Sequence, residues 1–335
     1  MAVDRLDHQI LHALGVNGRI AFRQLATVLD AGEHTVARRY RALVERGVVR
    51  VVAMPSPRDD DNGQLLRLHV HPGSGTRLAD ALARRDDVAW IRTAGAGGEI
   101  LCGVRAASAP ERDHLLLEQL PRTGRVTAVT VYEVLHHFRT PGHADWEGFP
   151  HPLDDEQRDR IRADAPPELE PPGTAPPMTA EDTALLRALS QDARQSAARV
   201  AAATGQTEAT VRRRLETLLS SAAIRLDRDL DPLQLGHPIG ATLYLDVAPG
   251  HLHHAGAALA RHGPTTFVAA VTGPANLYAG VVTRTIHDLY TYVHSTLADI
   301  EGVRHIETSL TGPYVKHART VRTPDGVNKV LPHDN

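Results

Sequence analysis

The chain has 335 residues and a formal net charge of −3, and 42% of its residues are hydrophobic and 23% charged. This composition is that of a folded protein and excludes wholesale disorder, while the length suits two to four domains of ordinary size. The single cysteine, Cys102, excludes an internal disulfide and a zinc site built from cysteines.

The sequence carries neither of the usual membrane or export signals. No stretch approaches the roughly 20 apolar residues that a membrane-spanning helix needs. Residues 1–7 hold two acids where a secretory signal carries positive charge and then an apolar run. We therefore expect a cytoplasmic protein with no membrane partner.

The first 45 residues contain three segments whose apolar residues recur at helical spacing. Breaks at residues 15–18 and 30–32 separate the segments, and a β-run follows at residues 48–52. Three short helices, with a tight turn before the third and a strand after it, are typical of a winged helix-turn-helix. The apolar stripes are Leu6, Ile10, Leu11 and Leu14, then Phe22, Leu25, Val28 and Leu29, then Val36, Tyr40, Leu43 and Val44.

The next stretch alternates strand and helix patterns. Its order is strand, helix, strand, strand, helix, strand, which predicts a ferredoxin-like sheet with both helices on one face. The other face must also be covered, and a duplicated chain can cover it by packing sheet against sheet. The predicted strands are residues 65–71, 89–93, 100–105 and 127–134, and the predicted helices are residues 77–85 and 111–120.

An acid-rich and proline-rich segment follows. Residues 153–162 place acids toward one end and arginines toward the other, as the helix dipole prefers, and indicate one short helix. Residues 163–178 contain six prolines, which oppose both helix and core formation. We interpret this segment as a semi-rigid linker.

Beyond the linker the sequence repeats itself. A shift of 175 residues aligns residues 7–50 with residues 182–225 without a gap and matches 13 of 44 positions, Arg19 with Arg194 among them. The densest run pairs residues 33–39 with 208–214. At a shift two residues larger, residues 66–73 match 243–250 and residues 102–104 match 279–281. The protein is therefore two copies of one unit of about 140 residues.

Copy two repeats each element. Its helical stripes contain Leu185, Leu186 and Leu189, then Val200, then Val211, Leu215, Leu218 and Leu219, and Thr207 is the predicted N-cap of the third helix. Its sheet domain comprises residues 241–247, 251–262, 266–272, 277–283, 286–299 and 303–310. The expected domains are residues 1–54, 55–139, a linker at 140–177, residues 178–232, residues 233–319 and a tail at 320–335.

The motifs resemble those of the Lrp/AsnC regulators, the leucine-responsive or "feast/famine" family. The resemblance covers nearly the whole chain twice and rests on residues 6–19, 35–39 and 45–48 in copy one and on residues 187–194, 209–215 and 230–236 in copy two. It implies an α+β fold in which two winged helix-turn-helix domains are each followed by a ferredoxin-like, ACT-like sheet domain. It also implies a transcriptional regulator that binds double-stranded DNA, is modulated by an amino acid or related small effector, and forms homo-oligomers through its sheet domains.

The third helix of each copy supplies the candidate DNA contacts. With Val36, Tyr40 and Leu43 facing inward, the neighbouring side chains face outward or flank that face. Arginine suits guanine edges and phosphates. The predicted contacts are His34, Thr35, Arg38, Arg39 and Arg41 in copy one and Thr210, Arg212, Arg213 and Arg214 in copy two.

The resemblance places the effector near the glycine-containing turn between the second and third strands of each sheet. Backbone N–H groups of such a turn can bind a carboxylate, and a side-chain oxygen can bind an ammonium. The predicted effector residues are Gly98 and Glu99 in copy one and Thr272, Gly273 and Asn276 in copy two. A plain hairpin turn that needs glycine for positive φ is the alternative.

Other chemistry is weakly supported. The histidine clusters at residues 69–71, 136–137 and 251–254 lack the helical pair with an acid that a zinc hydrolase shows, so we expect no metal, no cofactor and no catalysis. One alternative is an AsnC-like enzyme of the sirohaem decarboxylase type, expected to carry Arg and His just after the second strand, where this chain has Arg92-Thr-Ala-Gly and Ala270-Val-Thr-Gly. An effector-independent architectural DNA-binding protein is the other.

Overall fold

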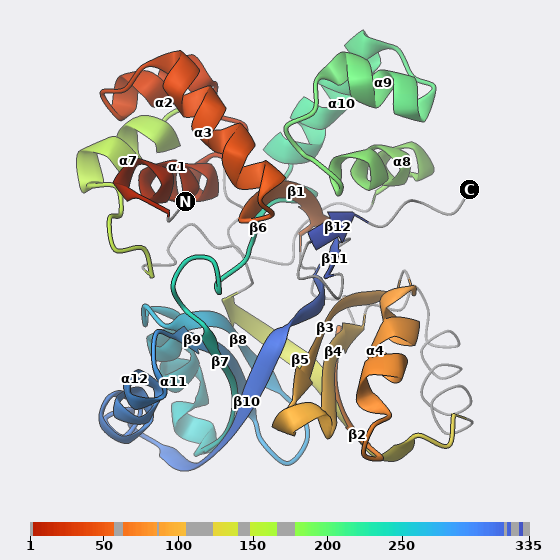
Figure 1. Cartoon of the computed structure of the whole chain (residues 1–335), viewed down its shortest axis with the longest axis vertical. Helices are drawn as coiled ribbons and strands as arrows, with labels where there is room; N and C mark the ends of the chain where they lie inside the picture. The colour runs from red at the N-terminus through yellow and green to blue at the C-terminus, as the bar shows by residue number, and fades with distance from the viewer. Residues whose placement is uncertain are drawn as a thin grey trace. The chain divides into compact units, whose positions relative to one another are not determined.

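The computed structural model describes residues 3–56, 63–85, 87–104, 123–139, 148–165, 178–317, 320–322 and 328–330. The chain divides into two compact units, and each unit contains parts of both copies (Figure 1). Unit 1 comprises residues 1–61 and 141–231, and unit 2 comprises residues 62–140 and 232–335. Unit 1 thus holds both helix-turn-helix regions, and unit 2 holds both sheet domains.

In unit 1 each copy forms three helices, as the apolar spacing predicts. Asp4 and Thr179 cap the first helix of each copy through reciprocal hydrogen bonds with the residue three positions on. Thr207 caps the third helix of copy two, which confirms the predicted N-cap. The helices are α1 (Arg5–Val16), α2 (Phe22–Val28) and α3 (Glu33–Glu45) in copy one, and α8 (Ala180–Leu189), α9 (Ala197–Thr204) and α10 (Glu208–Ser220) in copy two.

The strand after each third helix pairs with its counterpart in the other copy. β1 (Val49–Pro55) and β6 (Ile224–Leu230) form an antiparallel two-stranded sheet in which Val52 lies opposite Asp227. These two residues are equivalent in the repeat, so the ladder is centred on a pseudo-two-fold axis. This shared ladder, rather than a wing hairpin inside each copy, joins the two helix-turn-helix regions.

The acid-rich segment adds a helix to copy one. α7 (Asp155–Arg162) begins with an Asp154 capping box and packs against α1 and α2. Phe149, Leu153 and Ile161 are buried, and the Leu153 N–H donates to Nδ1 of His12 over 2.8 Å. The predicted short helix is confirmed, and the structure adds its docking site. The proline-rich residues 166–177 lie outside the described residues.

Unit 2 contains the two predicted sheets. In copy one the strand order is β3-β4-β2-β5, and in copy two it is β8-β9-β7-β10, the order expected of a ferredoxin-like fold. The predicted helix at residues 111–120 lies outside the described residues. Copy one contains β2 (Gln64–Val70), α4 (Gly75–Ala83), β3 (Val88–Ala94), β4 (Glu99–Val104) and β5 (Val126–Arg139). Copy two contains β7 (Ile239–Val247), α11 (Leu252–Ala260), β8 (Thr265–Val271), β9 (Leu277–Thr283) and α12 (Ile286–Thr291). A short π-helix (Tyr292–Thr296) continues α12, and β10 (Val303–His317), β11 (Thr320–Arg322) and β12 (Asn328–Val330) follow.

The two sheets join at both edges. β5 of copy one pairs with β8 of copy two, and β10 of copy two pairs with β3 of copy one, so the strands close into a ring. Tyr132, Tyr244 and Tyr278 pack against one another in a core to which both copies contribute. Because edge strands of each sheet pair with the other copy, those edges are not exposed to strand pairing with another molecule. The shared core covers the face of each sheet that lies opposite its helices.

Candidate nucleic-acid interface

The third helix of copy one presents a basic outer face. Val36, Tyr40 and Leu43 are buried, as predicted, and His34, Arg38 and Arg41 are exposed. Thr35 is half-buried beside them. The Arg41 Nε–H donates to the Ala37 carbonyl one turn earlier, which holds its side chain along the helix.

The third helix of copy two presents a different outer face. Arg212 and Arg213 are exposed, and Thr210 is half-buried with its N–H bonded to the cap residue Thr207. Arg212 forms an ion pair with Glu208 on the same helix. These positions are where a recognition helix contacts DNA, and their role in binding stays a prediction.

Arg39 and Arg214, which are equivalent in the repeat, brace the helices instead of projecting outward. Arg39 forms ion pairs with Asp4 at 2.8 Å and with Asp7 at 3.4 Å. Arg214 binds Asp182 at 2.6 Å and donates to the Thr179 hydroxyl at 2.8 Å. Each arginine thus ties the third helix of its copy to the start of the first.

In copy two, the Asp182 carboxyl of this brace is ionised near neutral pH. Burial raises the pKa of the Asp182 carboxyl, but hydrogen bonds from Thr179 and Arg214 outweigh burial and hold that pKa below its usual value. A charged carboxylate strengthens its hydrogen bonds to a guanidinium. The brace fixes the orientation of the outward-facing residues beside it.

Arg38 and Arg213 differ from these bracing arginines. Both side chains are exposed, the two residues are equivalent in the repeat, and neither guanidinium has an ion-pair or hydrogen-bond partner among the described residues. An exposed guanidinium on the outer face of a helix-turn-helix is available to a guanine edge or a phosphate. These two side chains are therefore the strongest candidates for direct DNA contact.

A reciprocal clamp joins the two helix-turn-helix regions. Arg19 of copy one donates to the carbonyls of Ala193 and Gln195, the second bond at 3.2 Å. Arg194 of copy two donates to the carbonyls of Gly18 at 2.7 Å and Ile20 at 2.8 Å. Every residue in one half of the clamp is the repeat equivalent of a residue in the other. The alignment singled out both arginines, but nothing in the sequence indicated that they reach across.

The two halves of the clamp differ in their aromatic contacts. The Arg194 guanidinium lies 4.6 Å from the centre of the Phe22 ring and 5.1 Å from that of Tyr40. Burial raises the pKa of Tyr40 to about 12, so its ring stays neutral. Copy two has Ala197 and Leu215 at the equivalent positions, so Arg19 has no ring there to stack on.

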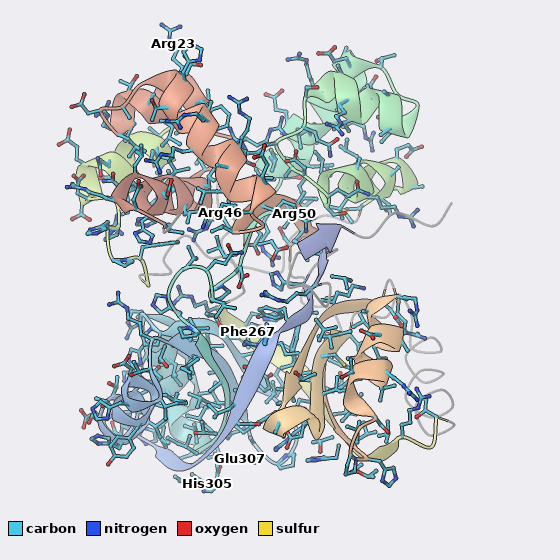
Figure 2. The ribbon with its side chains drawn as sticks, in the orientation of Figure 1. Arg23, Arg46, Arg50, Phe267, His305 and Glu307 are labelled. Atoms are coloured by element: carbon cyan, nitrogen blue, oxygen red, sulfur yellow. The ribbon has the colours of Figure 1, made fainter. Side chains whose placement is uncertain are left out.

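Buried charges on the shared ladder add to this contact. Arg50 on β1 pairs with Asp229 on β6 at 3.1 Å (Figure 2). Arg228 is 2% exposed, donates to the Leu11 carbonyl at 2.7 Å and lies over the Phe149 ring. The β6 strand of copy two therefore reaches into the helical core of copy one.

In unit 2, the glycine turn of copy two is already bonded to copy one. Thr272 donates its N–H to the Glu133 carbonyl and accepts from the Glu133 N–H with its hydroxyl, each over 3.0 Å. Gly273 has φ +104° and faces Tyr132, so the turn requires glycine. The Asn276 amide accepts from the Val247 N–H at 2.9 Å and donates to the Val247 carbonyl at 2.7 Å.

The glycine turn of copy one is bonded within its own copy. Gly98 donates its N–H to the Gly95 carbonyl at 3.0 Å. Glu99 accepts two hydrogen bonds from Arg67, at 3.0 and 2.8 Å, and Arg67 also contacts Glu307 of copy two at 2.7 Å (Figure 2). Thr272 and Gly273 thus contact the opposite sheet directly, whereas Glu99 is linked to it through Arg67. An effector role for the predicted residues stays a prediction.

Replacing Asn276 by alanine is expected to loosen the end of β7. The change leaves the Val247 N–H and carbonyl without their side-chain partner, which costs about 1–3 kcal/mol. Hydrogen exchange at the Val247 amide measures this locally and should accelerate. Unchanged exchange in the variant would show that the two hydrogen bonds between Asn276 and Val247 do not stabilise the end of β7.

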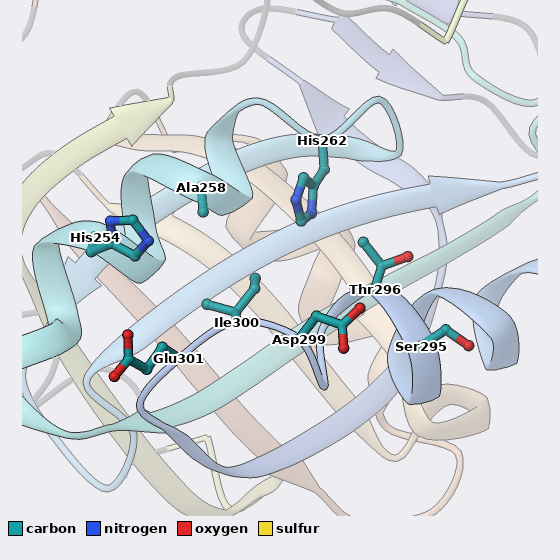
Figure 3. Close-up of a pocket in the computed structure, with 8 residues that line it drawn as sticks. All are labelled: His254, Ala258, His262, Ser295, Thr296, Asp299, Ile300 and Glu301. Atoms are coloured by element: carbon teal, nitrogen blue, oxygen red, sulfur yellow. The ribbon is translucent and has the colours of Figure 1, made fainter.

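Copy two also carries an open cavity of about 550 Å³ between α11 and the segment before β10 (Figure 3). His254 lines it from α11 and His262 from the turn that follows α11, and Asp299 and Glu301 line it from the other side. Burial lowers the pKa of His262, whose Nδ1 lies 3.0 Å from the Tyr292 hydroxyl. The carboxylates of Asp299 and Glu301 can bind a cationic group, and the imidazoles can form hydrogen bonds with the same small ligand.

Among the residues that the structure describes, no three His, Cys, Asp or Glu side chains lie close enough together to hold a metal ion. None of the helices described is both long and apolar enough to cross a membrane.

The comparisons with known proteins agree with this architecture. The AsnC-type helix-turn-helix domain matches residues 3–44 and again residues 178–219, and the Lrp/AsnC ligand binding domain matches residues 241–321. The chain belongs to the Lrp/AsnC family, with the helix-turn-helix present in tandem.

Its curated relatives are regulators of one copy's length. An uncharacterised HTH-type transcriptional regulator from Pyrococcus abyssi is 29% identical over 130 residues, which are 38% of this chain and 82% of that protein. A second, from Pyrococcus furiosus, is 28% identical over 130 residues and is covered to 88%.

A solved structure matches nearly the whole chain. The crystal structure of the siroheme decarboxylase NirDL superposes with a TM-score of 0.61 over 94% of this chain and 93% of that one, at 13% sequence identity. At that identity the likeness concerns the fold alone, and it confirms two helix-turn-helix regions with two ferredoxin-like sheets.

Proposed function

We propose that the chain is a sequence-specific DNA-binding transcriptional regulator in which one chain supplies both recognition helices, α3 and α10. The observation that carries the proposal is the pair of exposed arginines, Arg38 and Arg213, whose guanidinium groups have no partner among the residues that the structure describes. They lie on two AsnC-type helix-turn-helix regions that Arg19 and Arg194 clamp together. Such a pair presents two basic helices to one stretch of DNA.

Selection from random DNA with the full chain tests this function. A regulator enriches a defined sequence, and its affinity for that sequence exceeds its affinity for unrelated DNA by about a thousandfold or more at the same salt. Binding without an enriched sequence would instead support the architectural alternative, in which only the phosphate backbone is contacted.

We further propose that a small effector, with an amino acid as the expected class, acts through unit 2. The match of copy two to a ligand binding domain supports this, and the cavity beside Asp299 offers a second location besides the glycine turns. Thermal melting with a panel of amino acids identifies the effector. Loss of the response in Asp299→Asn places the effector in the cavity, and loss in Glu99→Gln places it at the turn of copy one.

The proposal assigns no reaction to the chain. The alternative is an enzyme like NirDL, which has been crystallised with an iron-uroporphyrin III analogue. Arg92, the residue considered for that chemistry, donates to the Gly312 carbonyl at 3.0 Å and stacks over Tyr314. Titration with an iron porphyrin decides between the two, since a saturable absorbance band at one site per chain would favour the enzyme.

A further inference from the structure

The pseudo-two-fold arrangement of unit 1 is built within one chain. Val52 pairs with its own repeat equivalent, Asp227, at the centre of the β1–β6 ladder. Arg19 and Arg194 bind equivalent carbonyls on opposite sides. These contacts relate the two helix-turn-helix regions of one chain by a pseudo-two-fold axis.

A homodimer places identical recognition helices on DNA, so its operator tends to be palindromic. Here the helices are related by the same kind of axis but are not identical. Thr35 and Arg38 have identical counterparts in Thr210 and Arg213, while three neighbouring positions differ. The differing pairs are His34 with Ala209, Ala37 with Arg212, and Arg41 with Glu216.

The largest chemical difference is that between Arg41 and Glu216. Both side chains are exposed on the outer part of their helices, and neither position contributes to the core. An arginine favours guanine or a phosphate, whereas a glutamate is repelled by phosphate and accepts a hydrogen bond from the cytosine amino group. The same position in the two halves therefore prefers different bases.

We infer that a single chain reads an operator made of two unlike half-sites, and that Arg41 and Glu216 set the difference between them. This inference rests on the proposed DNA-binding function and extends it to the form of the target. The equivalent Arg38 and Arg213 should prefer the same base in both half-sites. The differing residues should make the remaining bases of each half-site different.

Random-sequence selection with the wild-type chain and with Glu216→Arg tests the inference. The wild type should yield a consensus with two different halves, bound by one chain per site as measured by sedimentation of the complex. Glu216→Arg should change one half only, toward the sequence of the other, and should bind the wild-type operator roughly tenfold or more weakly than its own consensus.

Glu156→Arg on α7 is the matched control, because it makes the same charge change at an exposed position on a helix other than α3 and α10. It should leave the consensus unchanged. Glu216→Ala supplies a second variant that removes the charge without adding another, and it should relax one half-site only.

The possible results distinguish failure of this inference from failure of the proposed DNA-binding function. A palindromic wild-type consensus, two chains per site, or a change in both halves with Glu216→Arg would overturn the inference and leave DNA binding intact. The absence of any enriched sequence would overturn the proposed function itself.

Discussion

Replacing Arg38 or Arg213 by alanine is expected to weaken binding to the selected operator by about 5- to 150-fold, because a bidentate contact between arginine and guanine contributes about 1–3 kcal/mol. Thermal stability should change little, since both side chains are exposed and have no partner among the described residues. Fluorescence titration at two salt concentrations measures the effect.

The salt dependence reports what each arginine contacts. Loss of a base contact relaxes specificity at one position, whereas loss of a phosphate contact weakens binding to all sequences and lowers the salt slope by about 1. Arg160→Ala, an exposed arginine on α7, controls for the loss of one charge and should bind as the wild type does. Wild-type affinity in both Arg38→Ala and Arg213→Ala would remove these residues from the interface.

Replacing Arg194 by alanine is expected to lower the free energy of unfolding of unit 1 by about 2–4 kcal/mol. The change removes two charge-assisted hydrogen bonds, leaves the carbonyls of Gly18 and Ile20 without that partner, and removes the stacking on Phe22 and Tyr40. Equilibrium urea denaturation of the full chain measures the loss.

Arg19→Ala is the matched comparison across the pseudo-two-fold axis. It also removes bonds to two carbonyls but no aromatic stacking, so its effect should be smaller. Arg194→Lys keeps the charge without the planar fork and should recover only part of the loss. Equal destabilisation by Arg19→Ala and Arg194→Ala would show that the rings contribute nothing.

The sequence predicts the local structure well, because apolar spacing and capping are local properties. The helices of both helix-turn-helix regions lie where the spacing of apolar residues such as Val36 and Leu43 predicts them. Thr207 is the N-cap of α10, as predicted. The strand order of both sheets follows from the repeated pattern of strands and helices.

Contacts between distant segments could not be predicted in this way. Nothing local distinguishes a strand that forms a wing from one that pairs across copies, as β1 and β6 do. The outward spacing of Arg39 and Arg214 indicated DNA contacts, yet both lie within reach of acids at the start of the first helix, a tertiary proximity that spacing alone does not reveal. The glycine turn of copy two likewise has a partner in the opposite sheet, where Thr272 bonds Glu133.

Directed DNA cleavage tests most directly whether one chain places two different helices on one operator. An iron chelate attached to His34→Cys or to Ala209→Cys cuts the DNA beside α3 or α10, respectively. Both positions are exposed, whereas Cys102 is fully buried and burial raises its pKa to about 12, so only the introduced thiol reacts. We expect each variant to cut a single half-site and the two variants to cut opposite halves. Equal cutting of both halves by either variant would show that one chain does not place two different helices on one operator.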